Sequence, residues 1–134
     1  MREIEFRGKR IDNGEWIYGN LMQFEDSATF IFVDERKGAS TLTYAHFIIN
    51  NMHAIDEKTI GQYTGLKDKN SKKIFERDLC WDEHNECYGV VKFEEGKFLY
   101  VWENIAEDLW EVADSIEIYG NIHEIPSFIE EVAE

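Results

Sequence analysis

Cys80, His84 and Cys87 are the residues whose types and spacing come nearest to a metal site. They lie within eight residues, but six residues separate the cysteines and no second cluster of ligands follows. Structural zinc sites use four ligands and closer cysteine pairs. If a four-residue loop joins the flanking strands, Asp82 faces Cys87 and Cys80 faces Gly89. The cysteines then lie diagonally, so we expect no metal site and no disulfide. A metal-dependent hydrolase centred on His84 is the alternative, and it predicts bound metal after purification.

Catalytic motifs are missing from the sequence. There is no Gly-x-Ser-x-Gly, and Gly61 and Gly65 are not followed by the Gly-Lys-Ser/Thr of a phosphate-binding loop. With 28 acidic side chains in the chain, close carboxylate pairs arise by chance. The sequence therefore predicts no catalytic residue and no cofactor, and we expect that the chain is not an enzyme.

The charge balance is strongly acidic, with 28 acidic against 14 basic side chains and a net charge of −14. Such a surface repels phosphate backbones, which disfavours broad binding of nucleic acid. Acidity of this kind keeps a small protein soluble. A more specific interpretation is an acidic face that docks a basic protein partner, such as a host DNA-binding protein.

A local basic patch interrupts this acidity in the middle of the chain. Four lysines lie in one polar turn: Lys67, Lys69, Lys72 and Lys73. Together with aromatic rings, on which bases can stack, they define the alternative hypothesis of a nucleic-acid-binding module. The aromatics alternate with polar residues as in core strands, so we expect most rings in the core and the lysines in a solvated turn. These lysines are the only interaction surface that the sequence suggests by residue.

The elements that position these residues are predicted to be mainly strands. The 134 residues fit one domain, 1–134, and the aromatic content of 14% favours pleated, half-buried surfaces. Asn-Gly at 13–14 predicts a type I′ hairpin with Ile11 opposite Trp16. Two more hairpins are predicted, one joining 79–82 to 87–93 and one joining 89–93 to 98–102.

Two short helical segments are also predicted. Ile105, Leu109 and Val112 are spaced for one apolar helical face, so 103–114 is expected to form a helical turn or a loop. Pro126 can open a short C-terminal helix, because the first helical position needs no N–H donor.

The sequence carries no sign of export or membrane insertion. No apolar run reaches the roughly 18 residues that a membrane span needs. The first residues alternate charged and apolar side chains, unlike a signal peptide. Two cysteines without an export signal indicate free thiols in a reducing compartment, so we expect a cytoplasmic protein.

Three stretches resemble the YopX protein family, whose members are encoded by bacteriophages and prophages. The resemblance lies in Ile-Glu-Phe-Arg at 4–7 with Trp-Ile-Tyr-Gly-Asn-Leu at 16–21, in Gly-Gln-Tyr-Thr-Gly-Leu-Lys-Asp-Lys-Asn at 61–70 with Ile-Phe-Glu at 74–76 and Asp78, and in Tyr-Gly-Asn-Ile-His-Glu at 119–124. The central stretch is the most specific of the three. The resemblance implies a partly open β-barrel with helical additions, in a phage accessory protein of the host cytoplasm. It implies no established activity, so no functional residue carries over.

The chain departs from the family pattern at Ser71 and Arg77, where family members usually have glycine. Glycine accepts a positive φ at little cost, so we expect Asn70 to take that conformation in place of Ser71. At Arg77 we expect an altered corner, because a side chain replaces a residue that allows close backbone approach.

The residues and the resemblance together predict a mainly β fold. We expect a small, partly open antiparallel β-barrel with short helical additions and a C-terminal helix. The leading functional hypothesis is a non-enzymatic interaction module that acts through its acidic surface or by self-association. Incomplete barrels leave strand edges that a second subunit can cover, which makes a homo-oligomer part of this hypothesis.

Overall fold

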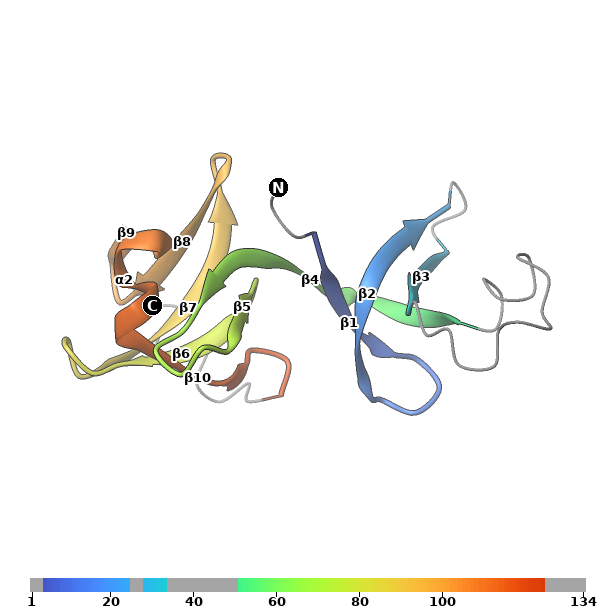
Figure 1. Ribbon diagram of the computed structural model, residues 1–134, viewed down its shortest axis with the longest axis horizontal. Helices are drawn as coiled ribbons and strands as arrows, with labels where there is room; N and C mark the ends of the chain where they lie inside the picture. The colour runs from blue at the N-terminus through green and yellow to red at the C-terminus, as the bar shows by residue number, and fades with distance from the viewer. Residues whose placement is uncertain (1–3, 25–27, 34–50, 125–134) are drawn as a thin grey trace. The chain divides into compact units, whose positions relative to one another are not determined.

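The computed structural model describes residues 4–24, 28–33 and 51–124 (Figure 1). Contacts divide the chain into two compact units, residues 3–62 and residues 63–134. Strand β4 (Met52–Lys67) contributes residues to both units. The expectation of one domain over 1–134 stays a prediction.

The first unit is an antiparallel sheet that closes on itself. Besides the first part of β4, it contains β1 (Phe6–Arg10), β2 (Trp16–Gln23) and β3 (Thr29–Phe32). The strands pair in the order β1-β2-β3-β4, and β1 also pairs with β4, which makes the arrangement ring-like. Ile31 and Ile55 are buried. A Cβ on Gly8 would collide with the Ile55 side chain, so this packing requires glycine there.

The predicted register of the first hairpin is wrong by two residues. Trp16 lies opposite Lys9, not opposite Ile11. The Ile11 N–H donates to the Ala54 carbonyl at 3.0 Å, which holds Ile11 against β4 and leaves a longer loop before β2. Of the Asn-Gly pair only Gly14 has a positive φ, so the turn is not type I′.

The second unit is a five-stranded antiparallel sheet with short helical segments, in the strand order β10-β6-β7-β8-β9. Strand β5 pairs with the end of β4. The elements are β5 (Lys73–Phe75), β6 (Asp78–Asp82), β7 (Cys87–Glu94), β8 (Lys97–Trp102), β9 (Ile105–Asp108), α2 (Leu109–Val112), the 3₁₀ helix η2 (Ala113–Ser115) and β10 (Ile116–Asn121). The pairing of Asp82 with Cys87 and of Cys80 with Gly89 confirms the predicted β6–β7 hairpin.

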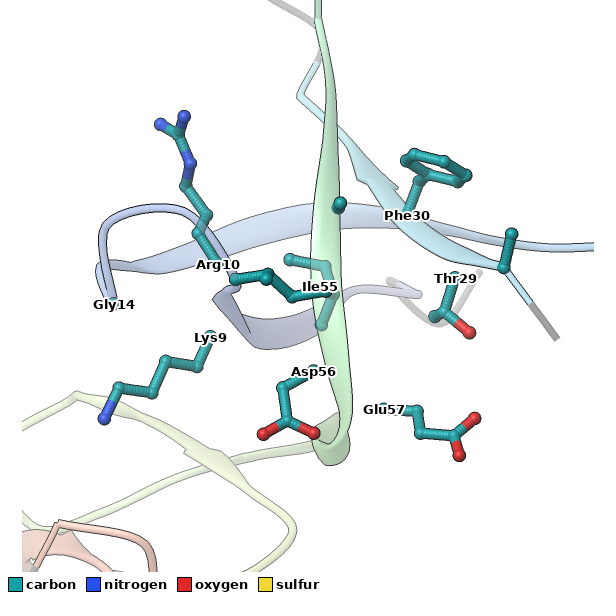
Figure 2. A pocket seen from close by; sticks show the side chains of 11 residues that line it. Lys9, Arg10, Gly14, Thr29, Phe30, Ile55, Asp56 and Glu57 are labelled. Atoms are coloured by element: carbon teal, nitrogen blue, oxygen red, sulfur yellow. The ribbon is translucent and has the colours of Figure 1, made fainter.

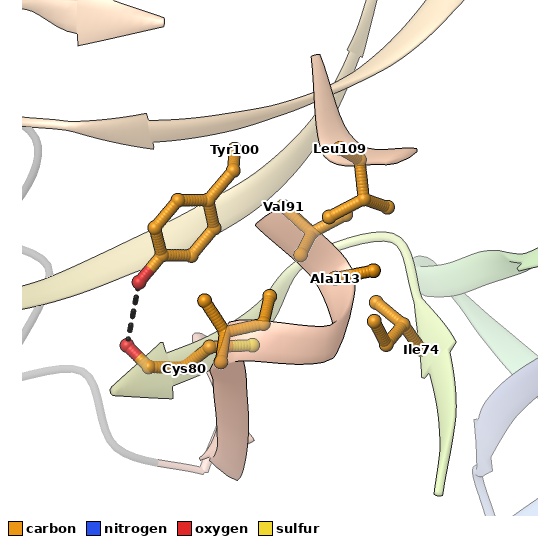
Figure 3. Packing of buried hydrophobic residues seen from close by; sticks show 7 residues of the cluster. Ile74, Cys80, Val91, Tyr100, Leu109 and Ala113 are labelled. Carbon is orange, nitrogen blue, oxygen red and sulfur yellow. Dashed lines mark hydrogen bonds between the residues drawn. The ribbon is translucent and has the colours of Figure 1, made fainter. Parts of the chain in front are cut away.

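One face of this sheet carries the core of the second unit (Figure 3). Val91 and Tyr100 are cross-strand partners on β7 and β8, and both are fully buried. Ile74 from β5 and Leu109 from α2 belong to the same cluster. The Tyr100 hydroxyl donates to the Cys80 carbonyl at 3.1 Å, which satisfies the polar end of an otherwise apolar side chain.

The mainly β, antiparallel fold is confirmed, although the strands form two sheets of which one is ring-like. Within residues 103–114 the predicted helical turn is present as α2, but strand β9 precedes it, so the predicted helical face is wrong at Ile105, which is 42% exposed. The C-terminal helix predicted from Pro126 lies outside the described residues. No helix in the described ranges is long and apolar enough to cross a membrane.

Candidate interaction groove

The lysine-rich turn is built around the buried carboxylate of Asp68. One carboxylate oxygen accepts the Asn70 and Lys72 N–H groups, both at 2.9 Å. The other accepts the N–H of Ile118 on β10 at 3.0 Å. Because this turn also donates the Lys69 N–H to the Ile116 carbonyl at 3.0 Å, it covers the outer edge of β10. The turn therefore has a structural role that its charge does not indicate.

The structure does not bring the four predicted lysines together as one free basic patch. Lys69 forms an ion pair with Glu83 at 3.2 Å, and this contact raises the pKa of the lysine. The Lys73 ammonium lies 5.3 Å from the centre of the Tyr63 ring, which is buried. Lys67 and Lys72 are exposed, and Lys67 lies opposite Lys73 across the β4–β5 pair. Two of the four ammonium groups thus have intramolecular partners.

The cysteine and histidine cluster is also dispersed. Cys80 is fully buried in the core, and Cys87 is half-buried; both are free thiols. Burial is the main cause that raises the pKa of Cys87, followed by the charge of Asp82. The Asp82 carboxylate accepts the His84 N–H at 3.0 Å and so shapes the β6–β7 turn. Among the described residues, no group of three His, Cys, Asp or Glu side chains is placed to hold a metal ion.

The first unit has an open hollow of about 770 Å³ (Figure 2). Ile55 lies at its centre, and the side chain of Arg10 points away from Asp56 and Glu57 (Figure 2). Both carboxylate oxygens of Asp12 hold the Arg10 guanidinium, at 3.0 and 2.7 Å. The charged groups therefore do not converge on one point, and the hollow does not define a chemistry.

A second hollow, of about 320 Å³, lies wholly within the second unit, and we call it the β8–α2 groove. Five apolar side chains line it: Leu66, Phe93, Phe98, Leu109 and Trp110.

Strand periodicity explains why aromatic rings line the groove. Because side chains alternate across a strand, Phe93 lies on the same face of β7 as Val91, and Phe98 on the same face of β8 as Tyr100. Phe93 and Phe98 are cross-strand partners that extend the core face beyond the fully buried pair of Val91 and Tyr100. Phe93 and Phe98 contact edge to face, with ring centres 4.9 Å apart.

Trp110 forms the exposed lip of the groove. Its neighbour Leu109 is fully buried, and one residue further along a helical turn points about 100° away. Trp110 is accordingly 69% exposed, and Phe93 is 48% exposed. The floor of the groove is anchored, because Leu66 and Phe98 pack against the buried core cluster. An exposed indole thus stands beside a fixed apolar surface.

Charged groups surround Lys97 at this groove. The Lys97 ammonium forms an ion pair with Asp108 at 2.8 Å. This contact raises the pKa of Lys97, and the charges of Glu95 and Glu111 raise it further. Three carboxylates therefore act on one ammonium, and one of them, Asp108, is in direct contact with it.

The sequence pattern does not predict this groove, and it predicts most aromatics in the core. Tyr63 satisfies that expectation, but Trp110 does not. The spacing of Leu109 and Val112 could have predicted that Trp110 is exposed, because the residue directly after Leu109 lies outside the helical face that these two residues share. Phe93 shares the face of β7 that carries buried Val91, so strand alternation alone does not predict that Phe93 is exposed.

Two antiparallel sheets, one of them ring-like, and short helical segments define a mainly β protein class. The family model described as YopX protein matches residues 5–130, and the chain belongs to this family. The crystal structure of protein EF1440 from Enterococcus faecalis is similar in fold, with a TM-score of 0.57 and 21% sequence identity over 94% of this chain and 97% of that chain. A comparison with curated proteins finds no significant match.

Proposed function

We propose that this chain is a non-enzymatic protein-interaction module that docks a partner at the β8–α2 groove. The observation that carries the proposal is Trp110, which is 69% exposed at the lip of an anchored aromatic groove. Tryptophan is enriched among the residues that dominate binding energy in protein interfaces. A solvent-exposed indole beside half-exposed Phe93 supplies apolar area that a partner can bury.

The anchored floor favours binding over simple solvation of this surface. Leu109 is fully buried, and the Phe93–Phe98 contact fixes both rings. A partner that docks there orders few additional side chains, so less of its binding energy is lost to conformational entropy. We assign no catalytic role, because the buried carboxylates of Asp68 and Asp82 accept backbone N–H groups of their own turns.

Self-association through strand β9 is the second candidate function. Strand β9 ends the sheet order, and no strand pairs with its outer side in the part of the chain that the structure describes. An exposed edge can pair with the same edge of another copy. The net charge of −14 opposes that contact, which is why we place it second. Sedimentation velocity at micromolar concentration would detect it as a dimer that dissociates at low salt.

Site-specific photo-cross-linking tests the proposed docking site. A benzophenone amino acid replaces Trp110 in one sample and Tyr119, which is 52% exposed on β10, in the control. We expect one bacterial cytoplasmic protein to cross-link from position 110 and not from position 119. The wild-type chain should suppress this product as a competitor, whereas Trp110→Ala should not. Equal products from both positions, or equal suppression by both competitors, would overturn the proposal.

A further inference from the structure

Charged side chains lie beside the apolar floor of the β8–α2 groove. Asp108 and Lys97 neutralise each other across 2.8 Å. Glu95 and Glu111 are exposed and act on the same ammonium group. Glu95 directly precedes the lining residue Gly96 and Glu111 directly follows Trp110, so two further carboxylates adjoin the groove after this pairing.

We propose that the groove recognises a segment of a partner protein that carries arginine beside apolar side chains. The inference rests on the proposed function and names the chemistry of the partner. A guanidinium is planar and weakly hydrated, so it can stack on the exposed face of Trp110. An arginine of the segment can also form paired hydrogen bonds with an exposed carboxylate such as Glu111 of α2. The apolar side chains of the segment would cover Phe93 and the groove floor.

Charge complementarity selects this occupant over the others. A second copy of this chain also carries −14, so its approach to an acidic rim is repulsive. A nucleic acid is repelled for the same reason, since its backbone is anionic. An uncharged apolar segment would bury the rings but would gain nothing from Glu95 and Glu111. An arginine-bearing segment can both contact the aromatic rings and form ion pairs with the carboxylates.

The Lys97–Asp108 ion pair predicts how a substitution of Lys97 changes the binding of an arginine segment. The bound arginine competes with the Lys97 ammonium for the surrounding carboxylates. Lys97→Met removes this competitor and keeps the length and apolar character of the side chain. It should therefore tighten binding of an arginine segment by about 1.5- to 5-fold, the range of exposed charge pairs.

A titration with matched synthetic peptides tests the inference. The probe is the octapeptide Arg-Leu-Ser-Arg-Leu-Ser-Arg-Leu with blocked ends, and its counterparts have glutamine, glutamate or lysine in place of arginine. Binding is followed by the indole N–H resonance of Trp110, which Trp110→Phe identifies among the four tryptophans. We expect the arginine peptide to bind most tightly, the lysine peptide less tightly, and the glutamate peptide not at all.

Variants separate the groove from the general acidity of the chain. Trp110→Ala should weaken binding of the arginine peptide by about tenfold or more. Glu111→Lys should weaken it several-fold, whereas Glu57→Lys, an equal charge change on an exposed residue of the first unit, should have a smaller effect. Equal losses from the two charge reversals would mean general attraction and would overturn the inference.

The remaining outcomes distinguish this inference from the proposed function. If the glutamine peptide binds as tightly as the arginine peptide, the groove binds segments but charge does not select them, so only the inference fails. If no peptide shifts the Trp110 resonance while position 110 still cross-links a single protein, the inference again fails alone. A dimer that Trp110→Ala dissociates would identify a second copy as the occupant and overturn the inference.

Discussion

Replacing Ser71 by glycine is expected to stabilise the protein, because Ser71 has a φ of 66° in the turn after Asp68. In this left-handed region a side chain costs about 1–2 kcal/mol, whereas glycine adopts it without steric cost. Glycine also loses about 0.4–1 kcal/mol more conformational entropy on folding. The difference predicts that Ser71→Gly raises the free energy of unfolding by about 0.5–1 kcal/mol.

The geometry of the turn makes this a clean substitution. The Ser71 side chain is exposed, and within the described residues its hydroxyl has no hydrogen-bond partner. The Ser71 N–H donates to the Asp68 carbonyl at 3.0 Å, and glycine keeps that donor. Ser71→Ala serves as the control, because it removes the hydroxyl and retains the strained φ. We expect Ser71→Ala to leave stability nearly unchanged.

Asn70→Gly is the opposing variant. The expected positive φ at Asn70 is wrong, because Ser71 has the positive φ in the structure. Asn70→Gly therefore relieves no strain, and it removes the hydrogen bond from the Asn70 amide to Glu117 at 2.9 Å. We expect it to lower the free energy of unfolding by about 0.5–1.5 kcal/mol. Urea unfolding followed by tryptophan fluorescence measures both changes. A stabilising Asn70→Gly together with a destabilising Ser71→Gly would refute the reasoning.

Three further predictions concern the second unit. Gly89→Ala should destabilise the protein by about 1–3 kcal/mol, because its Cβ would lie 2.7 Å from the Tyr100 hydroxyl oxygen; thermal unfolding measures this, and an unchanged Tm would contradict it. Burial raises the pKa of Tyr100 above its ordinary value of 10.0, so the folded state keeps the phenol proton while the unfolded state releases it near pH 10. The contribution of the Tyr100 phenol to the free energy of unfolding is complete below pH 10 and should fall by about 1.4 kcal/mol per pH unit above it. Tyr100→Phe should remove this part of the loss of stability at alkaline pH. Thiol titration should find Cys87 reacting slowly in the native protein and Cys80 reacting only after unfolding, whereas two fast thiols in the native protein would contradict their burial.

Local chemistry was sufficient to predict the second unit's hairpins. The Asp82–Cys87 pairing follows from a polar four-residue interruption between two β-forming runs, and the structure has that register. The first hairpin was harder, because Ile11 is held by the Ala54 carbonyl of β4, about forty residues further along the chain. A turn preference of Asn-Gly cannot anticipate a competing strand. Long-range pairing of this kind is also what closes the first sheet.

The candidate groove was hidden from the sequence for a related reason. Phe93 and Phe98 follow the same alternation as Val91 and Tyr100, so sequence alone assigns all four to the core. Their exposure nevertheless differs: Phe93 is 48% exposed and Phe98 is half-buried, whereas Val91 and Tyr100 are fully buried. The alternation of these residues therefore does not encode the exposure of Phe93.

The central family motif is best explained by backbone geometry. The resemblance to the family implies glycine at the positions of Ser71 and Arg77, and both residues have a positive φ here, 66° and 69°. At Arg77 the backbone also donates to the Val91 carbonyl at 2.8 Å and accepts the Ile122 N–H at 3.0 Å, so this corner joins β7 to the segment after β10. A glycine at such a position is selected by conformation, whatever the protein binds. The motif therefore identifies the fold, whereas the functional proposal depends on Trp110 and its acidic neighbours, which lie outside the motif.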